Sequence, residues 1–245
     1  MHIIAESFWL PKQGHTPEQY EDAYYPLGGV NQTVHRFRCA VADGATEASF
    51  ADKWAQLLVK GYCEHDNLQV QLPQLQHLWY QHVKNIPLSW YAEAKLSQGA
   101  FATLIGLTLY SNQICQALAM GDSCLFHLQH THKLHCFPLT DSQQFDNQPP
   151  LLASAYTQSL DQFVHLETIW QPGDEFYLMT DALAYWFLSA YEQHHQPWQR
   201  IQRLTQESFE PWIAQLRADQ QIANDDVTVL RVIVCDHPLE ALKNA

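Results

Sequence analysis

The stretch VADGATEASFADKW, residues 41–54, passes from an apolar run into an amphipathic one through a carboxylate and a glycine. The apolar run belongs to residues 32–42, which predict a strand. Residues 47–64 predict a helix, because their large apolar side chains recur at intervals of three and four. Asp43 and Gly44 are therefore predicted to lie at a strand-to-helix junction, at the rim of a sheet.

Other aspartates occupy the same kind of junction between an apolar run and a turn. They are Asp122, Asp181, Asp225 and Asp226. Each one alone is more simply explained as a helix cap or a turn former. Asp181 fits that explanation less well, because the apolar segments on both sides of it predict burial, and an unpaired buried carboxylate is costly. Since strand ends converge at a rim, the pattern indicates a shared site, and oxygen ligands favour Mg²⁺ or Mn²⁺.

The rest of the chain predicts helices and strands in separate blocks. Residues 1–30 are expected to be loop-like, and residues 139–162 form a polar loop that is long for a compact domain. Further strands are expected at 100–110, 113–120, 123–129 and 133–137, a hairpin at 163–170 and 175–180, and a last strand at 227–234. Further helices are expected at 74–85, 88–97, 182–194 and 198–218, the last one interrupted at Pro211. Blocks of this kind indicate an α+β fold.

The composition favours one large domain over residues 1–245, because a hydrophobic content of 47% can fill a sizeable core. Asp and Glu outnumber Lys and Arg by 26 to 13, and the net charge of −13 argues against nucleic acid and anionic membranes as partners. The six cysteines contain no C-x-x-C pair, and the sequence shows no signal peptide or apolar membrane segment. A cytoplasmic protein is therefore expected, and we expect it to be a monomer.

Six short motifs, taken in order, carry a resemblance to a known family. They are Glu21-Asp22-Ala23, Asp43-Gly44, Gly99-Ala100-Phe101-Ala102, Gly121-Asp122-Ser123, Leu178-Met179-Thr180-Asp181-Ala182-Leu183 and Asp225-Asp226-Val227-Thr228-Val229. Together they resemble the metal-dependent protein phosphatases of type 2C, the PPM family, and indicate a divergent, bacterial-like member. Any single motif occurs by chance, whereas the ordered set is much more specific.

The resemblance implies a four-layer αββα sandwich, in which two central antiparallel sheets are flanked by helices. It also implies a binuclear site for Mn²⁺ or Mg²⁺ at one rim of the sheets. In that arrangement Asp43 bridges both ions, and the Gly44 carbonyl binds one of them. Asp181 and Asp225 complete the coordination of the other ion. Asp225 is preferred to Asp226 because it keeps the family's D-x-x-T spacing.

Three more carboxylates have roles that the resemblance implies. Asp22, together with Glu21, holds the second ion directly or through water, and Asp122 with Asp181 is a candidate for a third, weaker ion. Water that bridges two such ions is a strong nucleophile, and the ions neutralise charge during in-line displacement at phosphorus. Asp43 and Asp181 are therefore the residues that we assign to catalysis.

The part of the family pattern that holds the substrate is altered in this chain. The family carries an arginine four residues before the Glu21 position, where this chain has Pro17, so Lys12 or His15 becomes the candidate phosphate ligand. Ala182 also stands where the family has glycine. Two hypotheses follow. The first is an enzyme of cellular signalling that acts on phosphoserine or phosphothreonine in a protein or peptide, and the second is a catalytically weak regulatory module that binds a phosphorylated partner.

Three further features have expected roles. The loop over residues 139–162 lies where the family carries a variable flap, so we expect it to be mobile and to affect substrate choice. The histidines of LFHLQHTHKLH, residues 125–135, are expected to lie on a solvated hairpin. Glu47 is most simply a partner of a helix dipole, and its closeness to Asp43 leaves a supporting role beside the metals open.

Overall fold

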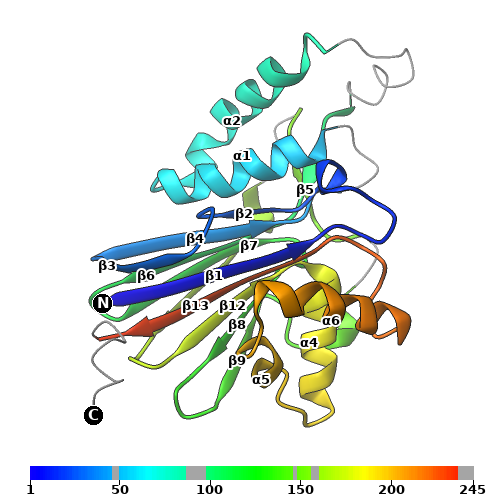
Figure 1. Ribbon diagram of the computed structural model, residues 1–245. Coiled ribbons are helices and arrows are strands. Elements are labelled where there is room, and N and C mark those ends of the chain that lie inside the picture. Colours follow the sequence, from blue (N-terminus) through cyan, green and yellow to red (C-terminus); the bar gives the residue numbers. More distant parts are fainter. Residues whose placement is uncertain (46–49, 87–97, 146–147, 156–159, 237–245) are drawn as a thin grey trace.

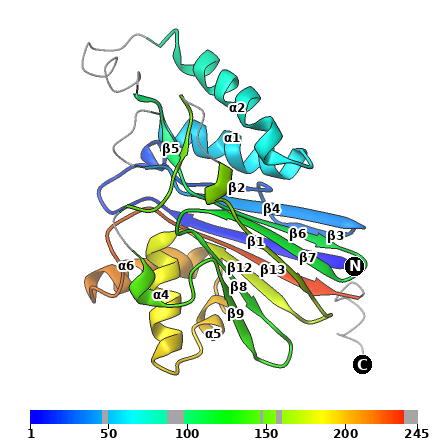
Figure 2. The ribbon, with the colours of Figure 1, turned by 180° about the vertical axis from the view of Figure 1, so that it is seen from behind.

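The structure is a computed structural model that describes residues 1–45, 50–86, 98–145, 148–155 and 160–236. Two antiparallel sheets pack face to face, and helices cover the outer face of each (Figures 1 and 2). One side carries α1 (Ala51–Glu64) and α2 (Leu68–Val83), and the other carries α4 (Asp181–Glu192), α5 (Trp198–Ile201) and α6 (Gln206–Ala218). Buried apolar clusters fill the space between the sheets and beneath both helical layers. The expected αββα sandwich is confirmed.

The sheet covered by α4, α5 and α6 has six strands in the order β3-β1-β13-β12-β8-β9. Their bounds are Val30–Thr33 (β3), His2–Leu10 (β1), Val227–Cys235 (β13), Glu175–Met179 (β12), Cys124–Leu128 (β8) and Leu134–Phe137 (β9). β1 pairs with β13 along its whole length, from His2 opposite Cys235 to Leu10 opposite Val227. The expectation of a loop over residues 1–30 is therefore wrong for this central strand.

β1 lacks the usual sequence pattern of a strand because both of its faces are covered. Ile3 and Ala5 belong to the core between the sheets, whereas Phe8 belongs to the core beneath the α4 and α6 helices. Apolar residues on both faces remove the strict alternation that identifies a half-buried strand.

The sheet covered by α1 and α2 has five strands in the order β11-β7-β6-β4-β2. Their bounds are Val164–Ile169 (β11), Ile114–Met120 (β7), Leu104–Tyr110 (β6), Arg36–Ala42 (β4) and Ala23–Tyr25 (β2). A small third sheet pairs β5 (Phe101–Ala102) with β10 (Leu152–Ala153). The segment expected as one strand over residues 32–42 thus supplies the end of β3 to one sheet and β4 to the other.

The hairpin expected over residues 163–180 is wrong. β11 pairs with β7 in the five-stranded sheet, whereas β12 pairs with β13 and β8 in the six-stranded sheet. Trp170 is buried at the crossing, where its indole Nε1 donates to the carbonyl oxygen of Tyr110 at 3.0 Å. The turn that follows therefore carries the chain between sheets instead of returning it alongside the same strand.

Capping side chains explain where two of the helices, α2 and α6, begin. α2 begins earlier than expected, because the Asn67 side chain accepts a hydrogen bond from the Val70 N–H at 3.2 Å. The helical region expected at 198–218 is divided before Thr205, which caps α6, and Pro211 lies inside α6 instead of breaking it. The helix expected at 88–97 lies outside the described residues. No helix in the described ranges is long and apolar enough to cross a membrane.

Strand ends from both sheets meet at one rim of the sandwich, on the right in Figure 1. In the five-stranded sheet, the first residue of β2, Ala23, pairs with the last residue of β4, Ala42. In the six-stranded sheet, the last residue of β1, Leu10, pairs with the first residue of β13, Val227, and β12 ends beside them. The residues just beyond these ends are those that the sequence selects as a site.

Candidate metal centre

The Glu21-Asp22 and Asp43-Gly44 segments lie side by side where β2 and β4 meet the rim. The pairing of Ala23 with Ala42 places Asp22 and Asp43 at adjoining positions. A Cβ atom on Gly44 would come within 2.6 Å of the Glu21 carbonyl oxygen. Glycine is therefore needed at position 44, because any side chain there would push the two segments apart.

Asp22 is held from the other sheet by a threonine. Its side chain is 2% exposed, and its Oδ2 accepts a hydrogen bond from Thr228 Oγ1 at 2.7 Å. Thr228 lies on β13, and its N–H donates to Thr180 Oγ1 at 3.0 Å, while the Tyr20 hydroxyl also contacts Thr228 Oγ1. The other oxygen of Asp22, Oδ1, is buried and has no hydrogen-bond partner within the described structure. A buried carboxylate oxygen of this kind requires a partner, and a cation is the kind of partner that suits it.

The Asp225-Asp226 pair divides into two different roles. Asp226 is buried, and its two oxygens accept hydrogen bonds from the backbone N–H groups of Lys12 at 2.8 Å and Glu21 at 2.6 Å. It therefore fastens the N-terminal segment to the start of β13. Asp225 is less buried, and its Oδ1 accepts a hydrogen bond from the neighbouring Asp226 N–H at 2.9 Å.

Asp181 and Asp122 stand at the other two junctions of the rim. Asp181 is the first residue of α4, and its Oδ1 accepts from the Ala182 N–H at 2.5 Å. Asp122 is buried in the turn between β7 and β8. Thr103 connects that turn to Asp43, because its Oγ1 accepts from the Asp43 N–H at 3.2 Å and lies 2.6 Å from Ser123 Oγ. Hydrogen bonds through Thr103 thus join the turn that carries Asp122 to the strand end that carries Asp43.

The aspartates act on one another electrostatically. Burial raises the pKa of Asp43 well above its usual range, and the negative charges of Asp22, Asp181, Asp225 and Asp122 raise it further. Burial also raises the pKa of Asp22 well above its usual range. The pKa of Asp181 is raised to about 6 by burial and then by Asp225. All five predicted aspartates are therefore brought into one electrostatic cluster, in which ionisation of Asp22, Asp43 and Asp181 is less favourable than that of an isolated carboxyl group.

The fit to divalent ions rests on this chemistry. As they stand, no three His, Cys, Asp or Glu side chains in the described ranges converge closely enough to hold a metal ion. Asp22, Asp181 and Asp225 each have one oxygen that accepts a hydrogen bond from another group of the protein. The atoms available as metal ligands are all carboxylate oxygens, and their negative charges repel one another. One buried oxygen of Asp22 has no hydrogen-bond partner within the described structure. Hard cations such as Mg²⁺ and Mn²⁺ match the chemistry of this set.

Comparison with known families settles the relationship of the chain. The sequence profile described as protein phosphatase 2C matches residues 16–224. The chain belongs to the protein phosphatase 2C family. The matched range contains four of the five clustered aspartates and ends one residue before Asp225, which the last sequence motif selects. No curated protein matches the chain.

Solved structures of bacterial proteins, serine/threonine phosphatases among them, share the fold at low sequence identity. The serine/threonine phosphatase PstP/Ppp of Mycobacterium tuberculosis has a TM-score of 0.63 at 15% identity, over 96% of this chain and 100% of that one. PppA, a regulatory component of the T6SS in Pseudomonas aeruginosa, has a TM-score of 0.61 at 16% identity, over 95% and 98%. The catalytic domain of PstP in complex with two manganese ions has a TM-score of 0.56 at 16% identity, over 96% and 100%. These likenesses show the fold alone.

Lys12 and His15, the two residues expected to replace the family arginine, differ in their distance from the aspartates and in their exposure to solvent. The Lys12 side chain is largely buried, and its Nζ lies 3.7 Å from Glu21 Oε2, beside the candidate metal centre. His15 is exposed in a turn, and Pro17 begins the short helix η1 (Pro17–Gln19), also exposed. Of the two predicted substitutes, Lys12 is the one that the structure brings to the aspartates. Glu47 lies outside the described residues.

The described parts of the segment 139–162 are anchored to the sandwich. They contain η2 (Ser142–Gln144), β10 and η3 (Leu160–Gln162), and β10 pairs with β5 next to the rim. A Cβ atom on Gly121 would lie 3.0 Å from the Pro150 carbonyl oxygen, so this segment also packs against the turn that carries Asp122. The segment is therefore well placed to shape one side of the site, while its expected mobility stays a prediction.

The histidine cluster is not simply solvated, and that expectation is wrong for His127. The ring of His127 is buried against Phe176, and its Nε2 donates to Asp174 Oδ2 at 2.7 Å. Asp174 also accepts from the N–H groups of Gln171 and His130, both at 2.9 Å. This aspartate therefore fixes the crossing between β11 and β12 at the rim opposite the metal candidate.

Asp174 leads to a prediction about stability at acidic pH. Burial alone would raise its pKa, but the hydrogen bonds from His127, Gln171 and His130 outweigh burial and lower the pKa to about 2. The ionised form thus stabilises the fold above the unfolded pKa near 4, by about 2 kcal/mol, and this stabilisation is lost as the pH falls towards 2. Urea unfolding of Asp174→Asn should show a deficit at pH 7 that narrows between pH 4 and 2.5. A deficit that stays constant across that range would contradict the prediction.

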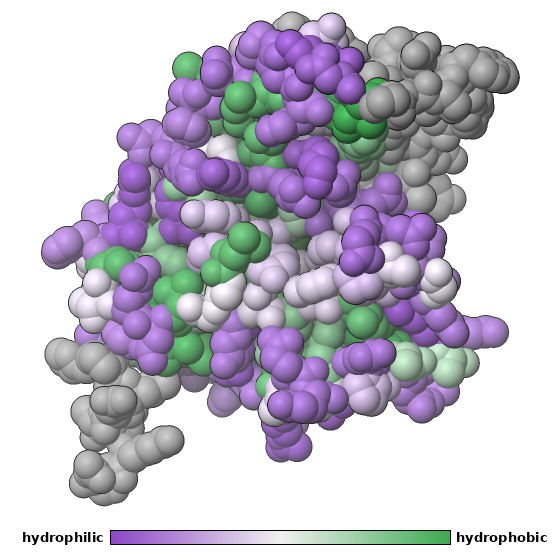
Figure 3. All heavy atoms as spheres, turned by 45° about the horizontal axis from the view of Figure 1, so that its top comes forward, coloured by the Kyte–Doolittle hydropathy of each residue, from purple (hydrophilic) through white to green (hydrophobic). Residues whose placement is uncertain are grey.

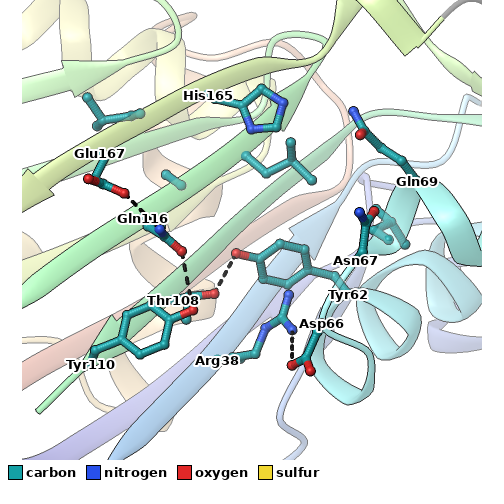
Figure 4. A pocket seen from close by; sticks show the side chains of 14 residues that line it. Arg38, Tyr62, Asp66, Asn67, Gln69, Thr108, Tyr110, Gln116, His165 and Glu167 are labelled. Carbon is teal, nitrogen blue, oxygen red and sulfur yellow. Dashed lines mark hydrogen bonds and ion pairs between the residues drawn. The ribbon is translucent and has the colours of Figure 1, made fainter.

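A separate polar cavity of about 510 Å³ lies on the outer face of the five-stranded sheet (Figure 4). Its floor is a row of residues that face one another on adjacent strands, Arg38, Thr108, Gln116 and Glu167. Hydrogen bonds already join much of this row, including Gln116 Nε2 to Glu167 Oε2 at 2.8 Å and Thr108 Oγ1 to the Tyr62 hydroxyl at 2.9 Å. The clustered aspartates lie at the rim instead, so this cavity is not the candidate centre.

Proposed function

We propose that this protein is a metal-dependent phosphatase that hydrolyses phosphoserine or phosphothreonine in proteins, using two Mn²⁺ or Mg²⁺ ions. The observation that carries the proposal is the electrostatic cluster of Asp22, Asp43, Asp122, Asp181 and Asp225 at one rim of a 2C-type sandwich. The PstP structure with two manganese ions supports the proposal at the level of the fold. The six free cysteines support a reducing compartment, which we take to be the cytoplasm.

Within this proposal the residues have distinct tasks. Asp43 is assigned to both ions and the Gly44 carbonyl to one of them, while Asp181 and Asp225 complete the other. Two divalent ions supply Lewis acidity at phosphorus and an activated water for in-line attack. The chain supplies rigid placement: Thr228 fixes the Asp22 carboxylate, and the remaining hydrogen bonds of the rim fix the turns that carry the other ligands.

The outer carboxylates take supporting assignments. Asp22 and Glu21 are assigned to the second ion directly or through water, and Asp122 with Asp181 is assigned to a third, weaker ion. Gly44 and Glu21 approach so closely that a Cβ atom on Gly44 would come within 2.6 Å of the Glu21 carbonyl oxygen, so the segments that carry these assignments adjoin. Alanine at position 182 does not remove any of these oxygen ligands.

Lys12 is assigned to the substrate phosphate in place of the family arginine. Lys12→Met should raise the KM for an aryl phosphate about ten- to a hundredfold, because one charge-assisted hydrogen bond contributes about 1.5–3 kcal/mol. The kcat at saturating substrate should change much less. His15→Ala is the matched comparison, since His15 is exposed, and its effect should be smaller. Steady-state kinetics in Mn²⁺ decide the point, and an unchanged KM in Lys12→Met would show that another group holds the phosphate.

A catalytically weak module that binds a phosphorylated partner is the alternative function. The observation that favours it is Pro17, an exposed residue at the position of the family arginine, which cannot donate any hydrogen bond to phosphate. The alternative predicts that a phosphopeptide binds but is not turned over.

Hydrolysis assays separate the two functions. The purified chain should release phosphate from an aryl phosphate and from phosphoserine or phosphothreonine peptides when Mn²⁺ is present, and a chelator should abolish the release. Binding of the same peptides, measured by fluorescence anisotropy, provides the second readout. Binding without metal-dependent turnover would reject the enzyme and support the regulatory module.

A further inference from the structure

An aromatic groove of about 530 Å³ adjoins the candidate metal centre along the open edge of β2. One wall is α1, and the other is formed by β2 and the end of β1. The groove is lined by the aromatic residues Trp9, Tyr20, Tyr24 and Tyr25, by Leu27 and by Asp22, among others. β2 is an edge strand, since it pairs only with β4 within its sheet.

The groove presents large apolar surface to the outside. Trp9 is 37% exposed and Leu27 is 73% exposed, which is unusual for side chains of this size. The rings of Trp9 and Tyr20 pack against each other with centroids 4.7 Å apart, so this end of the groove is held in shape. Figure 3 shows pale and green residues gathered in the middle of this face of the molecule between hydrophilic ones.

Tyr20 and Asp22 connect the groove to the metal candidate. The Tyr20 hydroxyl contacts Thr228 Oγ1, and the same oxygen donates to the Asp22 carboxylate. The ring of Tyr20 thus lines the groove while its hydroxyl supports an aspartate of the centre. A ligand that fills the groove reaches the immediate neighbourhood of the site where a phosphate would be bound.

The chemistry of the groove selects its occupant. Within the described lining, the α1 wall carries two charged side chains, Lys60 and Glu64. Their Nζ and Oε1 atoms lie 3.9 Å apart, so the two charges offset each other. The remaining lining is mainly aromatic and aliphatic, which favours an apolar side chain over a charged one. An extended chain advances about 3.3–3.6 Å per residue, so a side chain in the groove belongs to a residue within a few positions of one at the centre.

We propose that the groove binds an apolar or aromatic side chain of the protein substrate, one to three residues from the phosphorylated residue. This inference rests on the proposed phosphatase function and names the class of sequence that the enzyme prefers. The shared residue Asp22 places the groove and the centre on one continuous substrate path.

Paired phosphopeptides test this specificity. In a phosphothreonine peptide series, one position at a time from −3 to +3 carries leucine or tryptophan in one member and serine in the other. For at least one position the apolar member should have a kcat/KM about 10- to 100-fold higher, as expected when a hydrophobic pocket is filled. In Trp9→Ala and in Leu27→Ser that ratio should fall towards one. Leu27→Ser is included because a side chain so exposed can change without loss of folding.

Val70→Ser is the matched control, since Val70 is 69% exposed on α2 and lies outside the groove lining. It should keep the wild-type ratio. If the wild type hydrolyses all peptides in Mn²⁺ without any preference, or if Leu27→Ser and Trp9→Ala both keep the preference, the groove inference is overturned while the phosphatase function stands. If neither the peptides nor an aryl phosphate are hydrolysed, the proposed function fails. Peptide binding measured by fluorescence anisotropy then tests the groove inference: tighter binding of the apolar member of a pair supports it, and equal binding overturns it.

Discussion

Asp43→Asn is expected to lower the Mn²⁺-dependent kcat by more than about 100-fold, because even an outer partner of a metal ligand typically accounts for 10- to 100-fold. The same change should raise the thermal stability of the protein in a chelator. The Asp43 carboxylate is half-buried and lies within the field of Asp22, Asp181 and Asp225, and a neutral amide of the same shape removes that repulsion. Loss of activity together with a gain in metal-free stability is the signature of a metal-binding carboxylate.

Two measurements on one preparation check this result. The kcat is measured with Mn²⁺, and the melting temperature is measured in a chelator between pH 5 and 8. The gain in stability should shrink as the pH falls, because protonation of Asp43 in the wild type removes the same charge. Asp219→Asn serves as the control, since Asp219 is exposed at the end of α6. An Asp43→Asn protein that is active, or that is less stable than wild type in the chelator, contradicts the assignment.

Asp225 and Asp226 are expected to respond in opposite ways, although they are adjacent in sequence. Asp226→Ala should destabilise the fold by about 3 kcal/mol, because it removes the buried carboxylate that accepts two hydrogen bonds from the backbone N–H groups of Lys12 and Glu21. Asp225→Asn should not destabilise the fold, because an amide oxygen can keep its local hydrogen bond and the neutral amide removes a charge that repels Asp43 and Asp181. It should nevertheless lower the Mn²⁺-dependent kcat by more than about 100-fold, as a lost metal ligand does.

Urea unfolding in a chelator and kinetics in Mn²⁺ separate the two aspartates. Each variant provides the control for the other, since both positions carry aspartate and are adjacent in sequence. Should Asp225→Asn remain fully active while Asp226→Ala loses Mn²⁺ affinity without losing stability, the ligand would be Asp226, and the register of the last motif would shift by one residue.

The sequence predicted the candidate site better than it predicted the strands that build it. Aspartates at strand ends were expected to meet at a rim. Asp43, Asp122 and Asp181 do so because neighbouring strands of a sheet end at the same rim. The partners of those aspartates could not be predicted, since contacts such as Thr228 with Asp22 join segments 206 residues apart. Hydrogen bonds of that range depend on the order of strands in the sheets, which local patterns do not determine.

The wrong expectations have related physical causes. β1 was missed because burial on both faces removes the alternation of a surface strand, and its position in the centre of a sheet is a long-range property. The turn before Asp174 has the composition of a hairpin turn, yet the buried Trp170 and the His127–Asp174 hydrogen bond direct the chain to the other sheet. His127 itself resembles its exposed neighbours in sequence, and only the distant carboxylate distinguishes it.

The central claim is that the clustered aspartates hold two divalent ions. The most direct test is a crystal structure of the protein in saturating Mn²⁺, with anomalous diffraction data to locate the metal. The account predicts two anomalous peaks at the rim about 3.5–4 Å apart, with the Asp43 carboxylate in contact with both and Asp181 and Asp225 on one of them. An absence of anomalous density at the rim, or a peak that the Asp43 carboxylate does not touch, would contradict it.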